Sequence, residues 1–143
     1  MRFGMHLPQI GRKAGPAAIR RAAEQAEALG FSDVWANDHL AVPAEAPYPP
    51  SKSFYEPVVT LTWAAAATRR VGLGTSVLVL PLRHPVHLAK ELATLDLLSE
   101  GRLILGAGAG WLEGEFQALG VPKAERGART DECIEILDRK SVV

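Results

Sequence analysis

The chain alternates between short apolar segments and helical patterns, and this alternation recurs four times. The apolar segments, which we predict to be strands, are residues 2–7, 32–36, 71–80 and 102–106. Each gap between them holds apolar residues at helical spacing. Parallel strands need a crossover connection of this kind, and the helices in such connections cover the sheet. The sequence therefore predicts an α/β fold built from about four βα units around a parallel sheet.

The predicted helices begin and end at residues that commonly mark helix ends. Pro16, Pro57 and Pro85 stand in the first turn of three helices, where the missing N–H of proline costs no hydrogen bond. Gly30 and Gly101 follow the first and third of these helices as left-handed caps. Two further helical segments are predicted over residues 112–119 and 125–139.

The composition argues against several classes of function. The 16 acidic residues balance the 16 basic ones, so net charge favours neither nucleic acid nor an anionic membrane as a partner. No apolar run approaches the roughly 18 residues of a bilayer-spanning helix. Cys133 is the only cysteine and has no internal disulfide partner, so we expect a reducing cytoplasm. No Cys, His and carboxylate cluster has metal-ligand spacing, so we expect no metal site.

Polar residues follow the predicted strands where each strand gives way to the next helix. In parallel α/β folds the chemistry gathers at these carboxyl ends of the strands. The residues found there are His6, residues 37–39, residues 81–84 and residues 106–111. The second strand is followed by an unusually long loop over residues 37–56, rich in proline and alanine. A loop of that length is commonly functional, and a lid is one possible role.

Four βα units leave two strand edges and one sheet face uncovered. The segment 71–80 is too apolar to face water, so the four strands form either a small open sheet or half of an eight-stranded barrel. We favour the half-barrel. A flavodoxin-like binding domain is a further alternative, which we disfavour because its phosphate loop should follow the first strand. The segment 8–11 at that position, Pro-Gln-Ile-Gly, lacks the required pattern.

Short motifs spread over the chain, up to about Leu137, carry a family resemblance. They are residues 3–8, 30–35, 37–39, 73–78, 84–85, 97–102, 108–111 and 125–130. No single motif is specific, but their order and spacing together resemble the luciferase-like monooxygenases, the bacterial luciferase superfamily. The resemblance is closest to the members that use the deazaflavin F420 or FMN.

The resemblance implies a (β/α)8 TIM barrel about twice as long as this chain. Residues 1–143 would then form one truncated domain, the N-terminal half of the barrel. Barrels of this type often hold a cofactor phosphate in the loops after strands 7 and 8. Because those loops would be missing, we expect the chain to carry half a site and to be inactive alone.

The resemblance also assigns roles to Asp38 and His39, just past the second strand. His39 is the candidate for proton transfer, because a histidine titrates in the range that this task requires. Asp38 is a candidate for both catalysis and cofactor binding. Judged from the residues alone, Asp38 could simply cap a loop and His39 could be a surface residue.

Four further residues are implied as cofactor contacts. Family members place a non-prolyl cis peptide at the position of Ser76-Val77, where it forms a bulge that supports the cofactor ring; the alternative is a plain buried strand. Ala109 and Gly110 match family contact positions, and the alternative there is a flexible turn. This glycine run is not a dinucleotide fingerprint, because Trp111 stands where the third glycine is required.

Trp111 and His6 are the substrate-side candidates. Trp111 could instead pack on the helix that follows it, and His6 could be a core residue. The resemblance implies an F420- or FMN-dependent oxidoreductase or monooxygenase that acts on a small organic molecule, and we expect a homo-oligomer. Pro43 and Trp111 depart from the sugar-phosphate dehydrogenase branch, which argues against that substrate. The alternative function is a non-catalytic half-barrel that associates with itself or with a partner chain.

Overall fold

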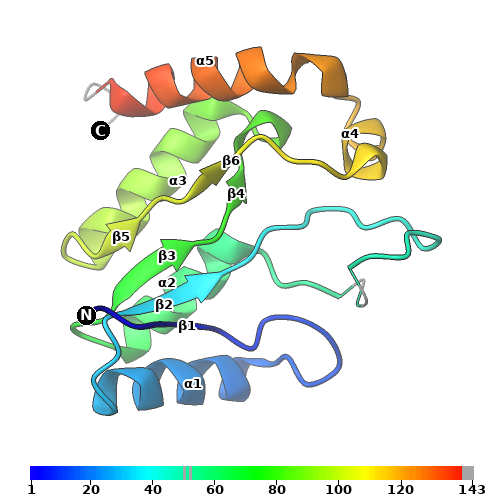
Figure 1. Ribbon diagram of the computed structural model, residues 1–143. Coiled ribbons are helices and arrows are strands. Elements are labelled where there is room, and N and C mark those ends of the chain that lie inside the picture. The colour runs from blue at the N-terminus through cyan, green and yellow to red at the C-terminus, as the bar shows by residue number, and fades with distance from the viewer. Residues whose placement is uncertain (50, 52, 140–143) are drawn as a thin grey trace.

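The computed structural model describes residues 1–49, 51 and 53–139, and it confirms the predicted α/β class (Figure 1). A parallel sheet has the strand order β1-β2-β3-β5. Its strands are β1 (Gly4–His6), β2 (Asp33–Ala36), β3 (Gly72–Thr75) and β5 (Leu103–Ile104). A second parallel pair continues beyond it, formed by β4 (Leu78–Val79) and β6 (Ala107–Gly108).

The helices cover one face of these strands, and the opposite face is turned toward the viewer in Figure 1. They are α1 (Pro16–Ala28), α2 (Pro57–Ala67), α3 (Pro85–Leu98), α4 (Glu113–Ala118) and α5 (Arg126–Asp138). Two 3₁₀ turns, η1 (Leu80–Leu82) and η2 (Lys123–Glu125), precede α3 and α5. Pro16, Pro57 and Pro85 open their helices as predicted. In the part of the chain that is described, none of these helices has the length and apolar character to cross a bilayer.

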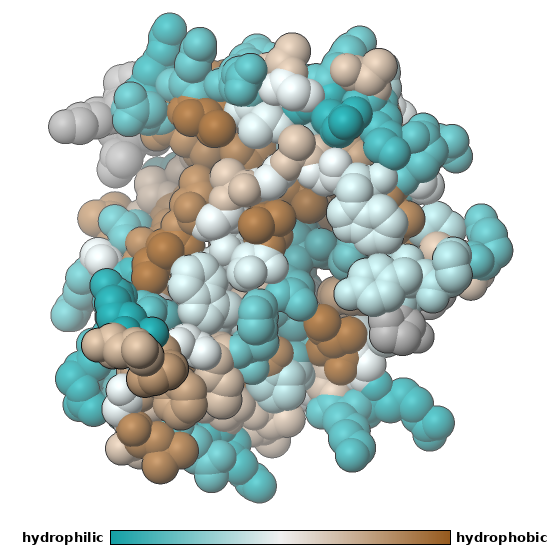
Figure 2. Space-filling view, in the orientation of Figure 1, coloured by the Kyte–Doolittle hydropathy of each residue, from teal (hydrophilic) through white to brown (hydrophobic). Residues whose placement is uncertain are grey.

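The hydrophobic core lies between the helices and the sheet. Val34 and Leu73, neighbours in register on β2 and β3, are fully buried against it. On the other face, the Trp35 indole lies so close to Gly74 that a Cβ there would come within 2.3 Å of the ring. No helix of the described residues covers this face, and Figure 2 shows apolar and weakly polar side chains across its middle. One face of the sheet is therefore packed against the helices, while the other has no covering layer among the described residues.

The prediction of one continuous third strand over residues 71–80 is wrong, because this segment forms β3, β4 and η1. The split follows from a change of partner, because the N–H of Ser76 donates to Ala36 on β2, whereas the N–H of Leu78 donates to Gly106. At the end of β3, just before the split, the Thr75 hydroxyl accepts from the N–H of Gly106 and donates to its C=O, in place of ladder contacts. The predicted fourth strand, 102–106, is shortened to β5, and β6 begins just beyond its predicted end. This leaves residues 76 and 77 outside the strands and exposed.

The guanidinium of Arg102 joins the C-terminal ends of α2 and α3 to the segment that leads into β3. It donates to Ser99 O at the end of α3, to Ala65 O and Thr68 O at the end of α2, and to Val71 O before β3. A fifth bond goes to the Thr68 hydroxyl. The last carbonyls of a helix have no partner within the helix, so a cationic donor here satisfies groups that would otherwise be orphaned.

We predict that Arg102→Ala lowers the free energy of unfolding by about 2–3 kcal/mol, because several buried carbonyls lose a charged donor at once. Arg102→Lys should recover only part of this loss, since one ammonium cannot reproduce the planar set of five donors. Urea unfolding measures both variants. The control is Arg12→Ala at an exposed loop position, where the change should stay within about 0.5 kcal/mol. Equal midpoints for Arg102→Ala and Arg12→Ala would contradict the assignment.

Candidate functional site

A cavity of about 610 Å³ opens at the carboxyl ends of the strands. This volume lies within the usual range for small-molecule sites. Segments from three consecutive βα units and from the loop after β1 build its wall. The lining residues are Ile10, Asn37, Asp38, His39, Tyr48, Pro49, Phe54, Ser76, Val77, Val79, Gly108, Ala109, Gly110, Trp111 and Glu115.

The structure brings together most of the residues that the sequence analysis singled out. Those that line the cavity are Asp38, His39, Ser76, Val77, Ala109, Gly110 and Trp111. His6, the last residue of β1, is exposed and lies outside the cavity lining. The site below is therefore built without His6.

The long loop between β2 and α2 supplies one side of the cavity. Its returning stretch runs beside the segment after β1, where Ile10 and Phe54 form an antiparallel bridge. The buried side chain of Gln9 joins both ends of the loop: its amide nitrogen donates to Asn37 O and Tyr55 O, and its oxygen accepts from Asn37 N. Gln9 thus joins the two ends of the loop at its base.

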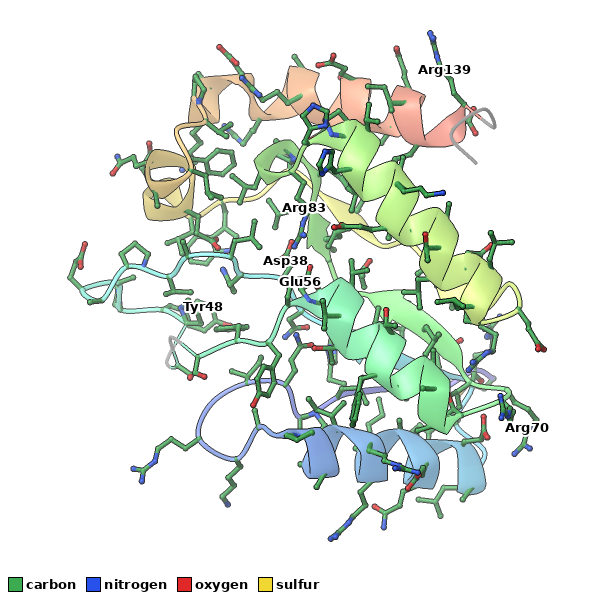
Figure 3. The ribbon with its side chains drawn as sticks, turned by 180° about the vertical axis from the view of Figure 1, so that it is seen from behind. Asp38, Tyr48, Glu56, Arg70, Arg83 and Arg139 are labelled. Carbon is green, nitrogen blue, oxygen red and sulfur yellow. The ribbon has the colours of Figure 1, made fainter. Side chains whose placement is uncertain are left out.

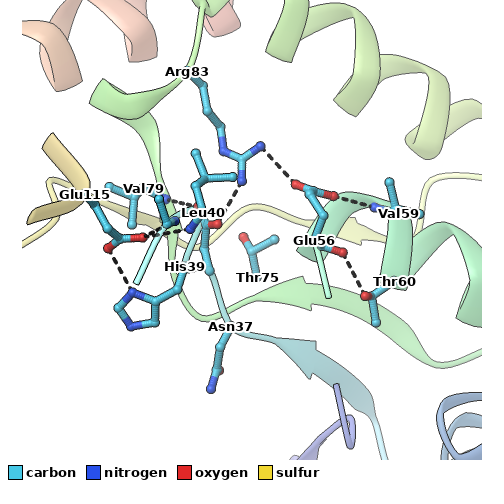
Figure 4. A network of polar contacts seen from close by, with 12 residues as sticks. Asn37, His39, Leu40, Glu56, Val59, Thr60, Thr75, Val79, Arg83 and Glu115 are labelled. Atoms are coloured by element: carbon cyan, nitrogen blue, oxygen red, sulfur yellow. Dashed lines mark hydrogen bonds and ion pairs between the residues drawn. The ribbon is translucent and has the colours of Figure 1, made fainter. Parts of the chain in front are cut away.

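Arg83 fixes the same base from the other side. Its guanidinium pairs with Asp38 Oδ1 at 2.8 Å and with Glu56 Oε1 at 2.9 Å, and these two carboxylates stand at opposite ends of the loop. Figure 3, seen from the side of the helices, shows Asp38, Glu56 and Arg83 close together near the start of α2. Glu56 also caps α2, accepting from the N–H of Val59 (Figure 4). The network closes the loop at the point where the chain enters the next helix.

Both carboxylate oxygens of Asp38 are engaged by the protein. Oδ2 accepts from the N–H of Val79 on β4, and Oδ1 accepts from Arg83. The side chains of Asp38 and Arg83 are only 0% and 11% exposed. This geometry favours a positioning role for Asp38, which joins the loop after β2 to β4, over a role in which its carboxylate reacts.

His39 lines the cavity beside a cluster of aromatic rings. Its ring meets Phe54 edge-on at a centroid distance of 4.9 Å and Trp111 at 6.2 Å, while Tyr48 lies 6.1 Å from Trp111. These rings come from the long loop and from the segment after β6. Phe54 and Trp111 therefore border His39 edge-on, and Tyr48 extends the aromatic surface beyond Trp111.

Glu115 is a buried carboxylate in the same cavity. Oε2 lies 2.9 Å from His39 Nδ1, and Oε1 accepts from the N–H groups of Leu40 and Ala41 at 2.7 and 3.2 Å (Figure 4). Burial raises the pKa of Glu115, but the hydrogen bonds from His39 and from the two backbone amides outweigh it and leave the pKa below its ordinary value. Glu115 is therefore an ionised acceptor.

The remaining wall is formed where the third strand breaks. The Ser76-Val77 peptide is cis, as the family resemblance implied, and both residues face the cavity. The glycines of β6 and beyond allow close packing on this wall: a Cβ on Gly108 would come within 2.4 Å of Val77, and one on Gly110 within 2.7 Å of Val79. Gly110 also has a φ of +76°, which a side chain would strain. These glycines thus serve the packing of β6 on β4.

Several residues of the site escaped the sequence analysis. Glu115 sits inside a predicted short helix, where nothing in its spacing separates it from an exposed glutamate such as Glu113. Gln9 and Glu56 likewise carry no local signal. The only sequence signal for Arg83 was its position among the residues that follow the third predicted strand. No group of three or more His, Cys, Asp or Glu in the described ranges could hold a metal ion.

A parallel half-barrel with a cavity at the carboxyl ends of its strands is the arrangement of a TIM-barrel enzyme site. The sequence model of the luciferase-like monooxygenases matches residues 1–140, and the chain belongs to this family. An uncharacterized protein of Mycobacterium tuberculosis is 37% identical over 127 residues, which cover 80% of this chain and 44% of the relative. The chain therefore spans less than half the length of that relative.

Solved structures also match most of this chain but less than half of their own length. Monooxygenase RslO1 from Streptomyces bottropensis superposes with a TM-score of 0.81 and 36% identity, over 97% of this chain and 42% of RslO1. The F420-dependent tetrahydromethanopterin reductase of Methanopyrus kandleri gives a TM-score of 0.64 and 32% identity, over 85% of this chain and 30% of the reductase. The oxygenating constituent of 3,6-diketocamphane monooxygenase from Pseudomonas putida, in complex with FMN, shares the fold at a TM-score of 0.82 and 21% identity, covering 97% and 39%. Together they confirm the half-barrel.

We predict that Asp38→Asn lowers the free energy of unfolding by about 3 kcal/mol, because it leaves the buried charge of Arg83 with only Glu56 as counter-ion. Denaturant unfolding of the purified variant measures the effect. Glu24→Gln is the matched control, since it removes a carboxylate from the exposed Arg20 pair on α1 and should cost less than about 0.5 kcal/mol. Similar losses in the two variants would show that the Asp38 network does not hold the loop base.

Proposed function

We propose that this chain contributes one wall of the active site of a flavin- or F420-dependent oxidoreductase of the luciferase-like family, acting on a small organic substrate. The observation that carries the proposal is the convergence of His39, the Ser76-Val77 wall and the Ala109-Gly110 segment on one cavity. Family membership and the named relatives support the same class of reaction.

The residues present fit a flat cofactor. Val77, Val79 and Ala109 provide an apolar wall against which a tricyclic ring could lie. Asn37 adds a polar feature: its side-chain oxygen is buried at the cavity with no hydrogen-bond partner among the described residues. A buried acceptor of this kind is typically satisfied by a ligand or by water. We therefore propose Ser76, Val77, Ala109 and Gly110 as the residues that would hold FMN or F420.

When bound, the cofactor supplies the redox chemistry. The chain's own contribution is to bind, orient and move a proton. His39 would take up or release the proton of the substrate oxygen, because oxidation or reduction at the adjacent carbon changes that oxygen between alcohol and carbonyl. Tyr48, Phe54 and Trp111 would hold the organic part of the substrate over His39, and Asp38 would keep the loop in place.

We also propose that the cavity is half of a complete site. The chain covers 42% of RslO1 and 44% of the mycobacterial relative, and one face of its sheet is uncovered. Loops after later strands of a full barrel often hold a cofactor phosphate. The chain alone would then bind the ring part of a cofactor weakly and show no turnover.

The test is a fluorescence titration of the purified chain with FMN and with F420. We predict that Ala109→Trp, which places a bulky ring in the cavity, weakens binding at least tenfold, whereas Ala17→Trp on the exposed side of α1 leaves it unchanged. Equal affinities in the two variants would place any binding elsewhere. No binding of either cofactor would favour the second candidate, a non-catalytic half-barrel whose open face pairs with another chain.

We propose in addition that the protein is a homo-oligomer joined through the outer side of α2. This helix carries no charged residue, and Val59 and Trp63 on its outer side are 68% and 49% exposed. They border an apolar groove of about 650 Å³ between α1 and α2. A helix on a free surface normally has a polar outer face, and an apolar one marks an interaction site.

We predict that Val59→Glu shifts the elution of the protein in sizing chromatography from an oligomer to a smaller species. The substitution would bury a charge in the subunit interface and so destabilise the oligomer. Leu29→Glu, at an exposed position at the end of α1, is the control and should leave the elution volume unchanged. An oligomer that survives Val59→Glu would contradict the α2 contact, and would point to the open sheet face instead.

A further inference from the structure

We propose that Glu115 is a positioning residue for His39: it holds a proton on Nδ1, so that the lone pair of Nε2 faces the cavity. The proposal deepens the function above and rests on it only for the statement that His39 acts on a substrate. The proton arrangement itself follows from contacts within the chain.

The first step is the number of donors around Glu115. Its two oxygens receive three contacts, from the N–H groups of Leu40 and Ala41 on Oε1 and from His39 Nδ1 on Oε2. Backbone N–H groups can only donate, so Oε1 is fixed as an acceptor. The lowered pKa of Glu115 keeps the carboxylate ionised, and an ionised Oε2 can only accept. The contact therefore requires a proton on His39 Nδ1.

The second step concerns the other ring nitrogen. A neutral imidazole carries one proton, so a proton on Nδ1 leaves Nε2 as an acceptor. Nε2 makes no hydrogen bond within the part of the chain that the structure describes, and the residue lines the cavity. His39 can therefore accept a substrate hydroxyl proton at Nε2, and the charged ring that results is paired with the carboxylate behind it.

The third step is the orientation of the ring. Glu115 and His39 are only 4% and 13% exposed, and the ring is held edge-on by Phe54 and Trp111. Glu115 comes from α4, whereas His39 and Phe54 lie in the loop between β2 and α2. Packing limits rotation of the imidazole, and the carboxylate selects which nitrogen points outward. This is the arrangement in which a second group fixes the tautomer of a catalytic histidine.

The test replaces Glu115 by glutamine, which has the same shape. The two backbone donors at Leu40 and Ala41 retain the glutamine oxygen, because an amide nitrogen in that place would face two N–H groups. The amide nitrogen must then face His39 and donate to Nδ1. We predict that Glu115→Gln reverses the tautomer, moving the proton from Nδ1 to Nε2.

The measurement is ¹⁵N nuclear magnetic resonance of the full chain with labelled histidine, at a pH where His39 is neutral. The resonances of His39 are assigned by comparison with His39→Asn. In the unaltered protein the Nδ1–H form should exceed the Nε2–H form about tenfold, the ratio expected from one net hydrogen bond, and in Glu115→Gln the excess should reverse. Glu113→Gln is the matched control; this neighbouring carboxylate pairs with Lys123 outside the cavity, so the tautomer should stay unchanged.

An Nε2–H tautomer in the unaltered protein would overturn the proposal, and this spectrum alone decides even where Glu115→Gln fails to fold. A folded Glu115→Gln chain that keeps the Nδ1–H form would also overturn it. The readout needs neither cofactor nor turnover, so it is separate from the proposed function. A chain with the expected tautomers that binds neither FMN nor F420 would refute the proposed function and leave the role of Glu115 standing.

Discussion

The site depends first on the buried charge of Arg83. A guanidinium in this position must be neutralised, and the chain supplies Asp38 from one end of the long loop and Glu56 from the other. The same contacts cap α2 through Glu56 and join the loop to β4 through Asp38. Gln9 repeats the closure from the side of β1 with uncharged hydrogen bonds. Every residue that the loop contributes to the cavity, including His39, is placed relative to this base.

The fold was largely predictable because its signals are local. The helix-opening prolines, the capping glycines Gly30 and Gly101 and the alternation of apolar segments each act within a few residues, and the structure confirms them. The continuity of the third strand was not predictable in the same way. Whether residues 76 and 77 extend a strand is decided by Ala36 and Gly106 on either side, and no short window contains both.

The candidate site was predictable only where a family motif marked it. Family motifs singled out His39, Ser76 and Trp111, and all three line one cavity. The motif at Asp38 also implied a reactive role, which the buried contacts of its carboxylate do not favour. The partners that position these residues lie far away in sequence: Arg83 is 45 residues from Asp38, and Glu115 is 76 residues from His39. A pairing at such separation leaves no periodicity or spacing to detect. It becomes visible only when the sheet brings consecutive βα loops to one edge.

The closed base of the 37–56 loop separates two kinds of sequence constraint. Gln9, Arg83 and the two carboxylates at the loop ends tie the entry and exit of the segment to the scaffold, so the outer residues between them are less constrained by the sheet. Tyr48, at the outer part, is exposed and borders the cavity. Substitutions, insertions or deletions around Tyr48 would change the rim of the cavity while the contacts at the loop base stay intact. The rim of the cavity can then vary independently of the sheet, much as hypervariable segments do on a constant immunoglobulin frame.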